Sequence, residues 1–131
     1  MSATVLYAAN PDEWPVYRAS LDLALKKKGV VVRLVDAVRD AKAVDYIVYA
    51  PCSGIQDFTP FANLKAVLSL WAGVESFQHN PTLGVPLARM VDDGLSAGMA
   101  EWVLGHVMRL HLGTDAHVLG QDGVWRNDVV A

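Results

Sequence analysis

The chain has 131 residues, of which 53% are hydrophobic and 19% are charged, and its formal net charge is −3. This length suits one domain of ordinary size. The composition excludes an intrinsically disordered chain, because disordered chains have too few apolar residues to build a core. The negative charge disfavours nucleic acid as a partner, since phosphate binding needs a surplus of lysine and arginine on one face.

A single cysteine, Cys52, leaves no internal disulfide framework and suits a reducing compartment. No apolar run reaches the ~18 residues of a membrane helix. Residues 1–4 (MSAT) lack the basic and apolar segments of a signal peptide. We therefore expect a cytoplasmic protein without a membrane partner.

The first ninety residues alternate short apolar or β-branched runs with helical or irregular segments. From Asp12 to Lys28, apolar residues recur at helical spacing, and Gly29 follows where such a helix ends. Short helical or irregular pieces are expected around 58–64 and 74–79. The predicted strands cover residues 4–9, 30–35, 46–50, 66–70 and 87–91.

Strands that are apolar along most of their length and alternate with helices are typical of a parallel sheet covered on both faces. We expect a flavodoxin-like, doubly wound α/β domain over residues 1–95. In such sheets, ligands bind beyond the carboxyl ends of the strands. The loops at these ends are 8–10, 51–54, 71–74 and 92–95.

Residues 96–112 (SAGMAEWVLGHVMRLHL) predict a longer helix of a different kind. Ser96 is expected to cap it, and Asp92 and Asp93 are interpreted as turn residues before that cap. Its apolar residues cover nearly the whole circumference, and a helix of this kind is buried on several sides. A small five-stranded domain does not supply that cover, so this end of the chain lacks a partner surface.

Motifs for cofactors and metals are missing from the sequence. No GxGxxG turn follows a strand, and no phosphate loop ending in Gly-Lys-Ser/Thr occurs. Cys52 has no second cysteine near it and is interpreted as a small loop or core residue. The four histidines, which we do not expect to bind a metal because their spacing is wrong for one, are His79, His106, His111 and His117.

The most informative segment is residues 63–75 (NLKAVLSLWAGVE), which predicts a buried strand, a tight turn at Ala72-Gly73 and a short helix. A turn of this kind exposes consecutive backbone amides that can hold a small carboxylate. The alternative is an ordinary turn that needs Gly73 for its backbone angles. The residues alone leave both interpretations open.

Four segments in order resemble the D-isomer-specific 2-hydroxyacid dehydrogenases. Residues 64–75 (LKAVLSLWAGVE) are similar to that family's Leu-Lys, apolar strand, Gly-Ala-Gly-Val and acidic residue. Residues 85–92 (VPLARMVD) resemble its next strand, 99–103 (MAEWV) its crossing helix, and 123–126 (GVWR) its glycine-x-tryptophan. Within the family, the resemblance is to the glyoxylate and hydroxypyruvate reductase branch.

This resemblance implies roles for particular residues. The amides of Gly73 and Val74 would hold the substrate carboxylate, with Ala72 beside them. Trp71 stands where many members have glycine, so its ring would narrow the pocket. The substrate-binding residues implied in this way are Ala72, Gly73, Val74, Trp71 and Tyr49, and Met99 would lie near the nicotinamide of the cofactor.

The resemblance also implies an oxidoreductase that uses NAD or NADP to reduce small 2-keto acids to D-2-hydroxy acids. The family's catalytic arginine, glutamate and histidine lie beyond residue 131, in or after a Rossmann cofactor domain that is missing here. We therefore assign no catalytic residue and expect the chain alone to be inactive.

Residues 96–131 would then be the crossing and dimerisation helix, followed by the start of the truncated nucleotide-binding domain. A homodimer is expected through 96–112, with Trp125 as a second contact; the alternative is that 113–131 folds back over the helix. The alternative function is a stand-alone flavodoxin-like module that binds small carboxylates or regulates, without catalysis.

Overall fold

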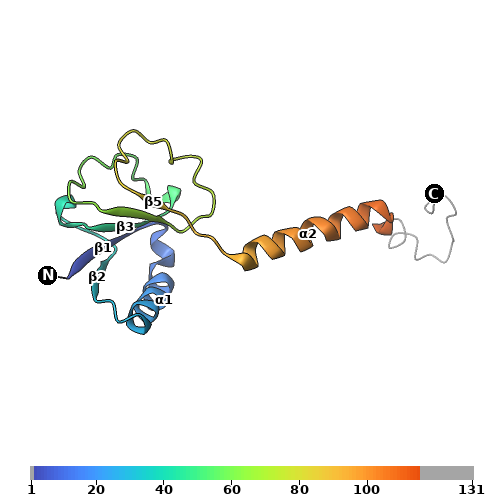
Figure 1. The fold of residues 1–131 in the computed structure, drawn as a ribbon, viewed down its shortest axis with the longest axis horizontal. Coiled ribbons are helices and arrows are strands. Elements are labelled where there is room, and N and C mark those ends of the chain that lie inside the picture. Colours follow the sequence, from blue (N-terminus) through green and yellow to red (C-terminus); the bar gives the residue numbers. More distant parts are fainter. Residues whose placement is uncertain (1, 116–131) are drawn as a thin grey trace. The chain divides into compact units, whose positions relative to one another are not determined.

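The computed structural model describes residues 2–115, so His117, Trp125 and the segment 123–126 lie outside the described residues. The chain forms two compact units, Met1–Met90 and Val91–Ala131. Among the described residues, the first unit contains a sheet, one α-helix and long loops, and the second contains one long helix (Figure 1). Neither helix among the described residues has both the length and the hydropathy that crossing a membrane requires.

The sheet of the first unit has five parallel strands in the order β2-β1-β3-β4-β5. This is the flavodoxin-like order, and it confirms the predicted α/β fold. The strands are β1 (Ala3–Ala8), β2 (Val32–Val35), β3 (Tyr46–Tyr49), β4 (Ala66–Ser69) and β5 (Leu87–Ala88).

Helix α1 (Trp14–Lys27) connects β1 to β2 and follows a 3-10 turn at Pro11–Glu13. Asn10 caps that turn by accepting a hydrogen bond from the amide of Asp12. At the other end, Gly29 has a φ of 66°, and the amide of Val30 donates to the carbonyl of Leu25. This left-handed ending, which glycine adopts without strain, stops the helix where the sequence predicts.

The sheet has an apolar core on each face, because successive side chains of a strand point to opposite sides. On one face, Val5, Tyr7 and Val48 pack beneath α1, and the Tyr7 ring lies 5.0 Å from that of Trp14. The other face is centred on buried residues of β1, β3, β4 and the loops, namely Leu6, Ala8, Val44, Ile47, Tyr49, Phe58, Val67 and Phe77.

Two long loops, 50–65 and 70–86, cover this second face of the sheet (Figure 1, green to yellow). Right-handed crossovers place them there, because β3→β4→β5 runs in the opposite direction to β1→β2. Two contacts join the loops: Nδ2 of Asn80 donates to the Gln56 carbonyl at 2.7 Å, and the Phe58 amide donates to the Thr82 hydroxyl at 3.0 Å. The pieces around 58–64 and 74–79 are turns rather than helices.

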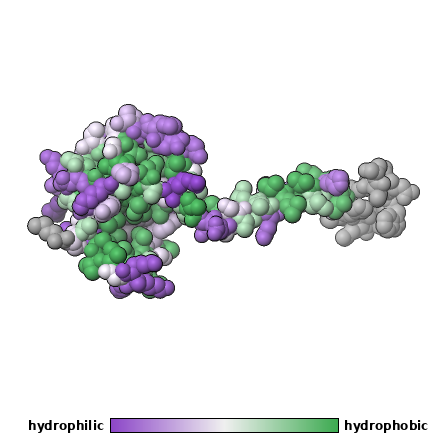
Figure 2. Space-filling view, in the orientation of Figure 1, coloured by the Kyte–Doolittle hydropathy of each residue, from purple (hydrophilic) through white to green (hydrophobic). Residues whose placement is uncertain are grey.

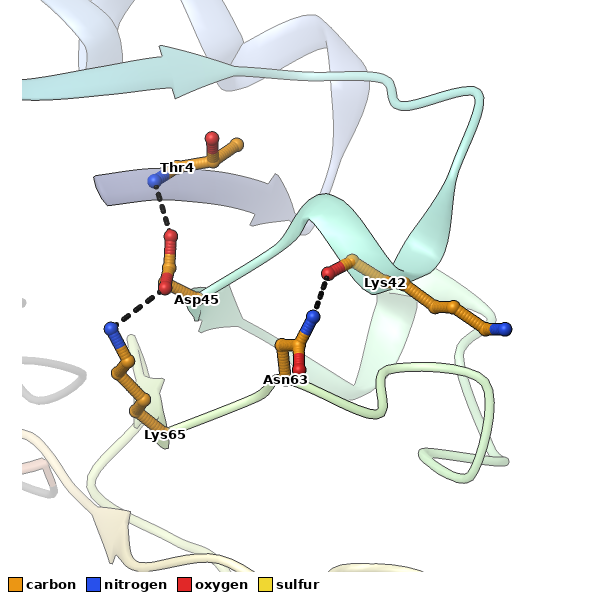
Figure 3. A network of polar contacts seen from close by, with 5 residues as sticks. All are labelled: Thr4, Lys42, Asp45, Asn63 and Lys65. Carbon is orange, nitrogen blue, oxygen red and sulfur yellow. Dashed lines mark hydrogen bonds and ion pairs between the residues drawn. The ribbon is translucent and has the colours of Figure 1, made fainter. Parts of the chain in front are cut away.

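A polar network ties the amino ends of three strands together (Figure 3). The Asp45 carboxylate accepts hydrogen bonds from the Thr4 amide and the Lys65 ammonium, both at 2.8 Å. Nearby, Asn63 donates to the Lys42 carbonyl at 2.8 Å. These contacts fix the starts of β1, β3 and β4. They lie at the amino ends of the strands, so they do not occupy the carboxyl ends, where ligands bind in such sheets.

The second unit contains α2 (Asp93–His111). The sequence predicts a start at Ser96, and this is wrong. Asp92 is the cap, since its side chain accepts a hydrogen bond from the Leu95 amide at 3.0 Å. A carboxylate placed four residues earlier takes up the first free amide, so the helix gains about one turn. Figure 2 shows apolar surface along α2, and no α2 residue is buried among those described.

Candidate functional site

The candidate site lies where β4 ends and the chain leaves the sheet. Ser69, the last residue of β4, is buried, and its hydroxyl accepts from the Trp71 amide at 3.0 Å. The same hydroxyl donates to the Trp71 carbonyl at 2.9 Å. One buried serine therefore bends the backbone directly after the strand and sets the course of residues 71–74.

The amides of Ala72, Gly73 and Val74 follow this bend. Within residues 2–115, none of the three donates a hydrogen bond to another group of the chain. Gly73 is exposed, so its amide is open to water or to a ligand. Consecutive unpaired amides at the carboxyl end of a parallel strand have the hydrogen-bonding character of an anion site.

The geometry of Gly73 bears on the two interpretations of the turn, which are an anion-binding turn and an ordinary turn that needs glycine for its backbone angles. The φ of Gly73 is not positive, unlike those of Gly29 and Gly54, so the backbone angles do not require glycine. A Cβ at Gly73 would lie 3.0 Å from Oε2 of Glu75. A Cβ here would press only on the movable end of the Glu75 side chain, so the turn does not need glycine for an unusual bend.

The segment after Val74 is not the short helix that the sequence predicts. The amides of Phe77 and Gln78 both donate to the Val74 carbonyl, at 3.1 and 2.8 Å, and the chain continues as a turn. The amides at 72–74 therefore belong to a bend that is held through the carbonyl of Val74. Because no helix follows, a helix dipole adds nothing to anion binding here.

Tyr49 lies behind the turn. Its side chain is 1% exposed, its ring centroid is 4.8 Å from that of Phe77, and its hydroxyl donates to the Ile55 carbonyl at 3.0 Å. Burial raises the pKa of this phenol, so the hydroxyl remains protonated and a donor. Tyr49 thus supports the turn through Phe77, and its predicted place in the lining of a substrate pocket stays a prediction.

The other residues named by the sequence analysis lie on different segments of the chain. Trp71 is 51% exposed at the bend itself. Met99 is exposed on α2, in the second unit. Cys52 is free and exposed in the loop that follows β3.

Sequence reasoning missed two residues of this site, Ser69 and Arg89. Arg89 directly follows β5, and its Nη1 donates to the Ala72 carbonyl at 3.4 Å. Both residues lie within segments that resemble the dehydrogenase family, but Arg89 is in the middle of the predicted strand 87–91 and Ser69 is still inside the predicted strand 66–70, so the pattern marks neither as a loop residue of a site.

Two further kinds of site lack their usual residues in the described part of the chain. The turn between β1 and α1 contains Asn10 and Pro11 and no glycine, so these residues do not fit the close backbone approach that a dinucleotide pyrophosphate needs. Across the described part of the chain, no three His, Cys, Asp or Glu side chains are grouped as a metal site would require. His106 instead stacks on Trp102, with ring centroids 4.2 Å apart.

Comparison with known proteins gives a structural relative. The chain is similar to the D-isomer specific 2-hydroxyacid dehydrogenase from Xanthobacter autotrophicus Py2, which was crystallised in complex with NADPH and MES. The TM-score is 0.71 and the sequence identity 28%, over 96% of this chain and 41% of that one. The chain therefore spans less than half the length of that dehydrogenase. No protein-family model and no curated protein matches the chain.

This similarity supports the coarser part of the sequence-based expectation. The parallel five-stranded sheet matches a domain of a 2-hydroxyacid dehydrogenase, and the relative is an oxidoreductase solved with NADPH. The narrower assignment to the glyoxylate and hydroxypyruvate reductase branch depends on the sequence resemblance alone.

Proposed function

We propose that the chain is the substrate-binding part of an NAD(P)-dependent D-2-hydroxyacid dehydrogenase that reduces small 2-keto acids of the glyoxylate or hydroxypyruvate type. The observation that carries this proposal is the run of unpaired amides at Ala72, Gly73 and Val74. The dehydrogenase similar to this chain, and the order of the family-like segments in the sequence, support the same reaction class.

In this proposal, the turn holds the carboxylate of the keto acid. Two carboxylate oxygens accept hydrogen bonds from neighbouring amides, and this fixes the position of the adjacent keto carbon. Holding a reactant in one orientation lowers the entropic part of a reaction barrier. The task of this chain is therefore to bind and orient the acid.

The cofactor belongs to another part of the complete enzyme. NADH or NADPH supplies the hydride there. Met99 is proposed to approach the nicotinamide once that part is present. This division of work explains why we assign no catalytic arginine, glutamate or histidine within the chain.

Trp71 and Tyr49 have different places in the proposal. Trp71 is half exposed beside the free amides, so its indole restricts the space above them and favours small acids. Tyr49 packs against Phe77, whose amide holds the Val74 carbonyl from behind. Tyr49 therefore keeps the turn rigid, and its part in lining the pocket belongs to the complete enzyme.

The direct test is a titration of the isotopically labelled chain with oxamate, an unreactive mimic of a small 2-keto acid. We expect the amide resonances of Ala72, Gly73 and Val74 to shift together, with a dissociation constant on the order of millimolar, or about −4 kcal/mol. Acetamide, which is neutral, is the control and leaves these resonances in place. Oxamate that shifts resonances elsewhere, and none at the turn, overturns the proposal.

A second test addresses catalysis. The purified 131-residue chain is expected to show no turnover of glyoxylate or hydroxypyruvate with NADH or NADPH, because hydride transfer needs the cofactor held against the substrate. Turnover above background contradicts this expectation. A reading frame that continues past the Ala131 codon into a strand and GxGxxG supports the dehydrogenase, whereas a stop codon there supports a stand-alone carboxylate-binding module.

A further inference from the structure

Arg89 brings a positive charge to the back of the carboxylate-binding turn. β5 pairs in the sheet only with β4, so the carboxyl ends of these two strands lie next to each other. Arg89 leaves the end of β5 and donates from Nη1 to the Ala72 carbonyl at 3.4 Å. The next residue, Met90, donates its amide to the Trp71 carbonyl, also at 3.4 Å. The segment after β5 therefore holds the turn by two successive carbonyls.

The position of this contact determines its effect on the amides. The Ala72 carbonyl and the Gly73 amide belong to one peptide group, which is planar and trans, so the two point in opposite directions. A cationic donor on the oxygen polarises the whole group and makes the N–H on the far side a stronger donor. Arg89 therefore acts on the side of the peptide away from the ligand.

A carboxylate of the chain itself also lies close to Gly73. Oε2 of Glu75 lies 3.0 Å from the place that a Cβ on Gly73 would take. An incoming carboxylate meets this like charge, and Arg89 supplies the opposite charge nearby. The turn thus has one exposed cationic side chain and one exposed carboxylate close to it.

We propose that Arg89 is a positioning residue that strengthens carboxylate binding by polarising the Ala72–Gly73 peptide and fixing the turn. This inference rests on the proposed function, because it assumes that the turn binds the substrate carboxylate. Arg89 does not contact the substrate. Its effect is modest, since the guanidinium is exposed and its contact with the carbonyl is long.

The test uses the full chain with Arg89→Met, Arg89→Lys and, as a matched control, Arg33→Met. Arg33 is an exposed arginine on β2, the opposite edge of the sheet, so the control removes the same charge far from the turn. We expect Arg89→Met to weaken oxamate binding roughly two- to fivefold, the range for exposed charge interactions. Arg89→Lys restores most of the affinity, and Arg33→Met leaves it unchanged.

Two further measurements separate a charge effect from a general loosening of the fold. The oxamate affinity of the original chain falls with added salt more steeply than that of Arg89→Met, because the screened cation is missing from the variant. The Gly73 amide proton of the ligand-free chain moves upfield in Arg89→Met and returns in Arg89→Lys. Well-dispersed amide spectra for all three variants show that they are folded.

The outcomes distinguish this inference from the function on which it rests. If the original chain binds oxamate at the turn and Arg89→Met binds it equally well, the inference is overturned and the proposed function stands. If the original chain does not bind oxamate at the turn, both are overturned. If Arg89→Met and Arg89→Lys lose affinity equally, or Arg33→Met loses as much as either, polarisation by the guanidinium is not the cause.

Discussion

At the scale of single residues, the site depends on the backbone amide of Gly73 rather than on its missing side chain. Its φ is not positive, and an added Cβ would meet only the Glu75 side chain. The nearest obstacle to a Cβ is the flexible end of the exposed Glu75 side chain. Two substitutions at this position therefore separate the effect of losing the amide donor from the effect of filling the space beside it.

Gly73→Pro removes the central amide donor and also restricts the backbone of Ala72. We expect it to weaken oxamate binding roughly tenfold or more, the loss for one hydrogen bond to a charged group. In a complete enzyme, KM for the keto acid would rise far more than KM for the cofactor. Gly73→Ala is the control: it keeps the amide, displaces only Glu75, and retains most of the affinity. Equal binding by all three forms would mean that the turn is purely structural.

Asp45 sets a pH limit on stability from the opposite end of the sheet. A hydrogen bond from Lys65, and a second from the Thr4 amide, hold the pKa of Asp45 below its usual range. A carboxyl group whose pKa is lowered by folding stabilises the protein above its unfolded pKa of about 3.9. That stabilisation is lost as the pH falls through the lowered pKa of the folded state.

We therefore expect Asp45→Asn to lower the free energy of unfolding at neutral pH. The difference from the original chain should shrink steadily below pH ~4, where the carboxylate becomes protonated in both states. Urea denaturation at a series of pH values measures it. Asp36→Asn, at an exposed aspartate after β2, is the control and should leave the unfolding curve nearly unchanged. A deficit for Asp45→Asn that does not vary with pH would exclude this ionic origin.

At the scale of elements, the sequence predicts all five strands, and the differences at their ends have local causes. The run 30–35 predicts a longer β2, but the amide of Val30 is used by the last turn of α1, and pairing starts only at Val32. The run 87–91 predicts a full strand, but β5 is an edge strand that pairs over two residues, and Arg89 already turns toward Ala72. Local propensity shows which runs are extended, whereas pairing partners decide where each strand ends.

The sequence predicts the turn at 72–74, but it does not predict the side chains that hold the turn in place. Apolar periodicity and an Ala-Gly pair mark a bend after a strand. Ser69, Phe77 and Arg89 reach that bend only because three separate segments meet there, and such contacts leave no periodic signal in a single sequence. The helix predicted after Gly73 fails for the same reason, since Phe77 is drawn into the core against Tyr49 instead of continuing a helix.

The cap of α2 gives a prediction that compares two neighbouring residues. Asp92→Ala should remove the hydrogen bond to the Leu95 amide and cost the helix about 1 kcal/mol, which frays its first turn. Ser96→Ala should have little effect, because Ser96 lies inside the helix and alanine is a good helix former. Amide hydrogen exchange at Leu95 measures both variants. Faster exchange in Ser96→Ala than in Asp92→Ala would restore the start that the sequence predicts.

At the scale of the whole molecule, the two units differ in how far they bury their apolar side chains. The first unit buries the inner faces of its strands beneath α1 and the loops. The second leaves large apolar side chains of α2 exposed, with Trp102 61% exposed, Leu104 61% and Leu110 76%. Figure 2 shows this apolar surface along the helix. An apolar surface of this size is typical of a helix that packs against another surface.

We propose that a second copy of the chain covers α2, so that the protein is a homodimer. Removing a large apolar side chain from water is worth roughly 1.5–3 kcal/mol, so several together outweigh the entropy lost when two chains associate. Trp125, a second predicted contact, lies outside the described residues. The alternative, in which residues 113–131 fold back over α2 within one chain, predicts a monomer. The molar mass in solution therefore distinguishes the two arrangements.

Light scattering of the purified chain over a wide concentration range measures this mass. We expect a dimer, and we expect Trp102→Glu or Val107→Glu to shift it to monomer, because a charge in an apolar interface loses its hydration without gaining a partner. Val16→Glu is the matched control, since Val16 is 70% exposed on α1, outside the second unit. The control should leave the dimer intact. A constant mass of 14.2 kDa for the original chain would exclude the interface, and a dimer that survives both substitutions on α2 would place the contact elsewhere.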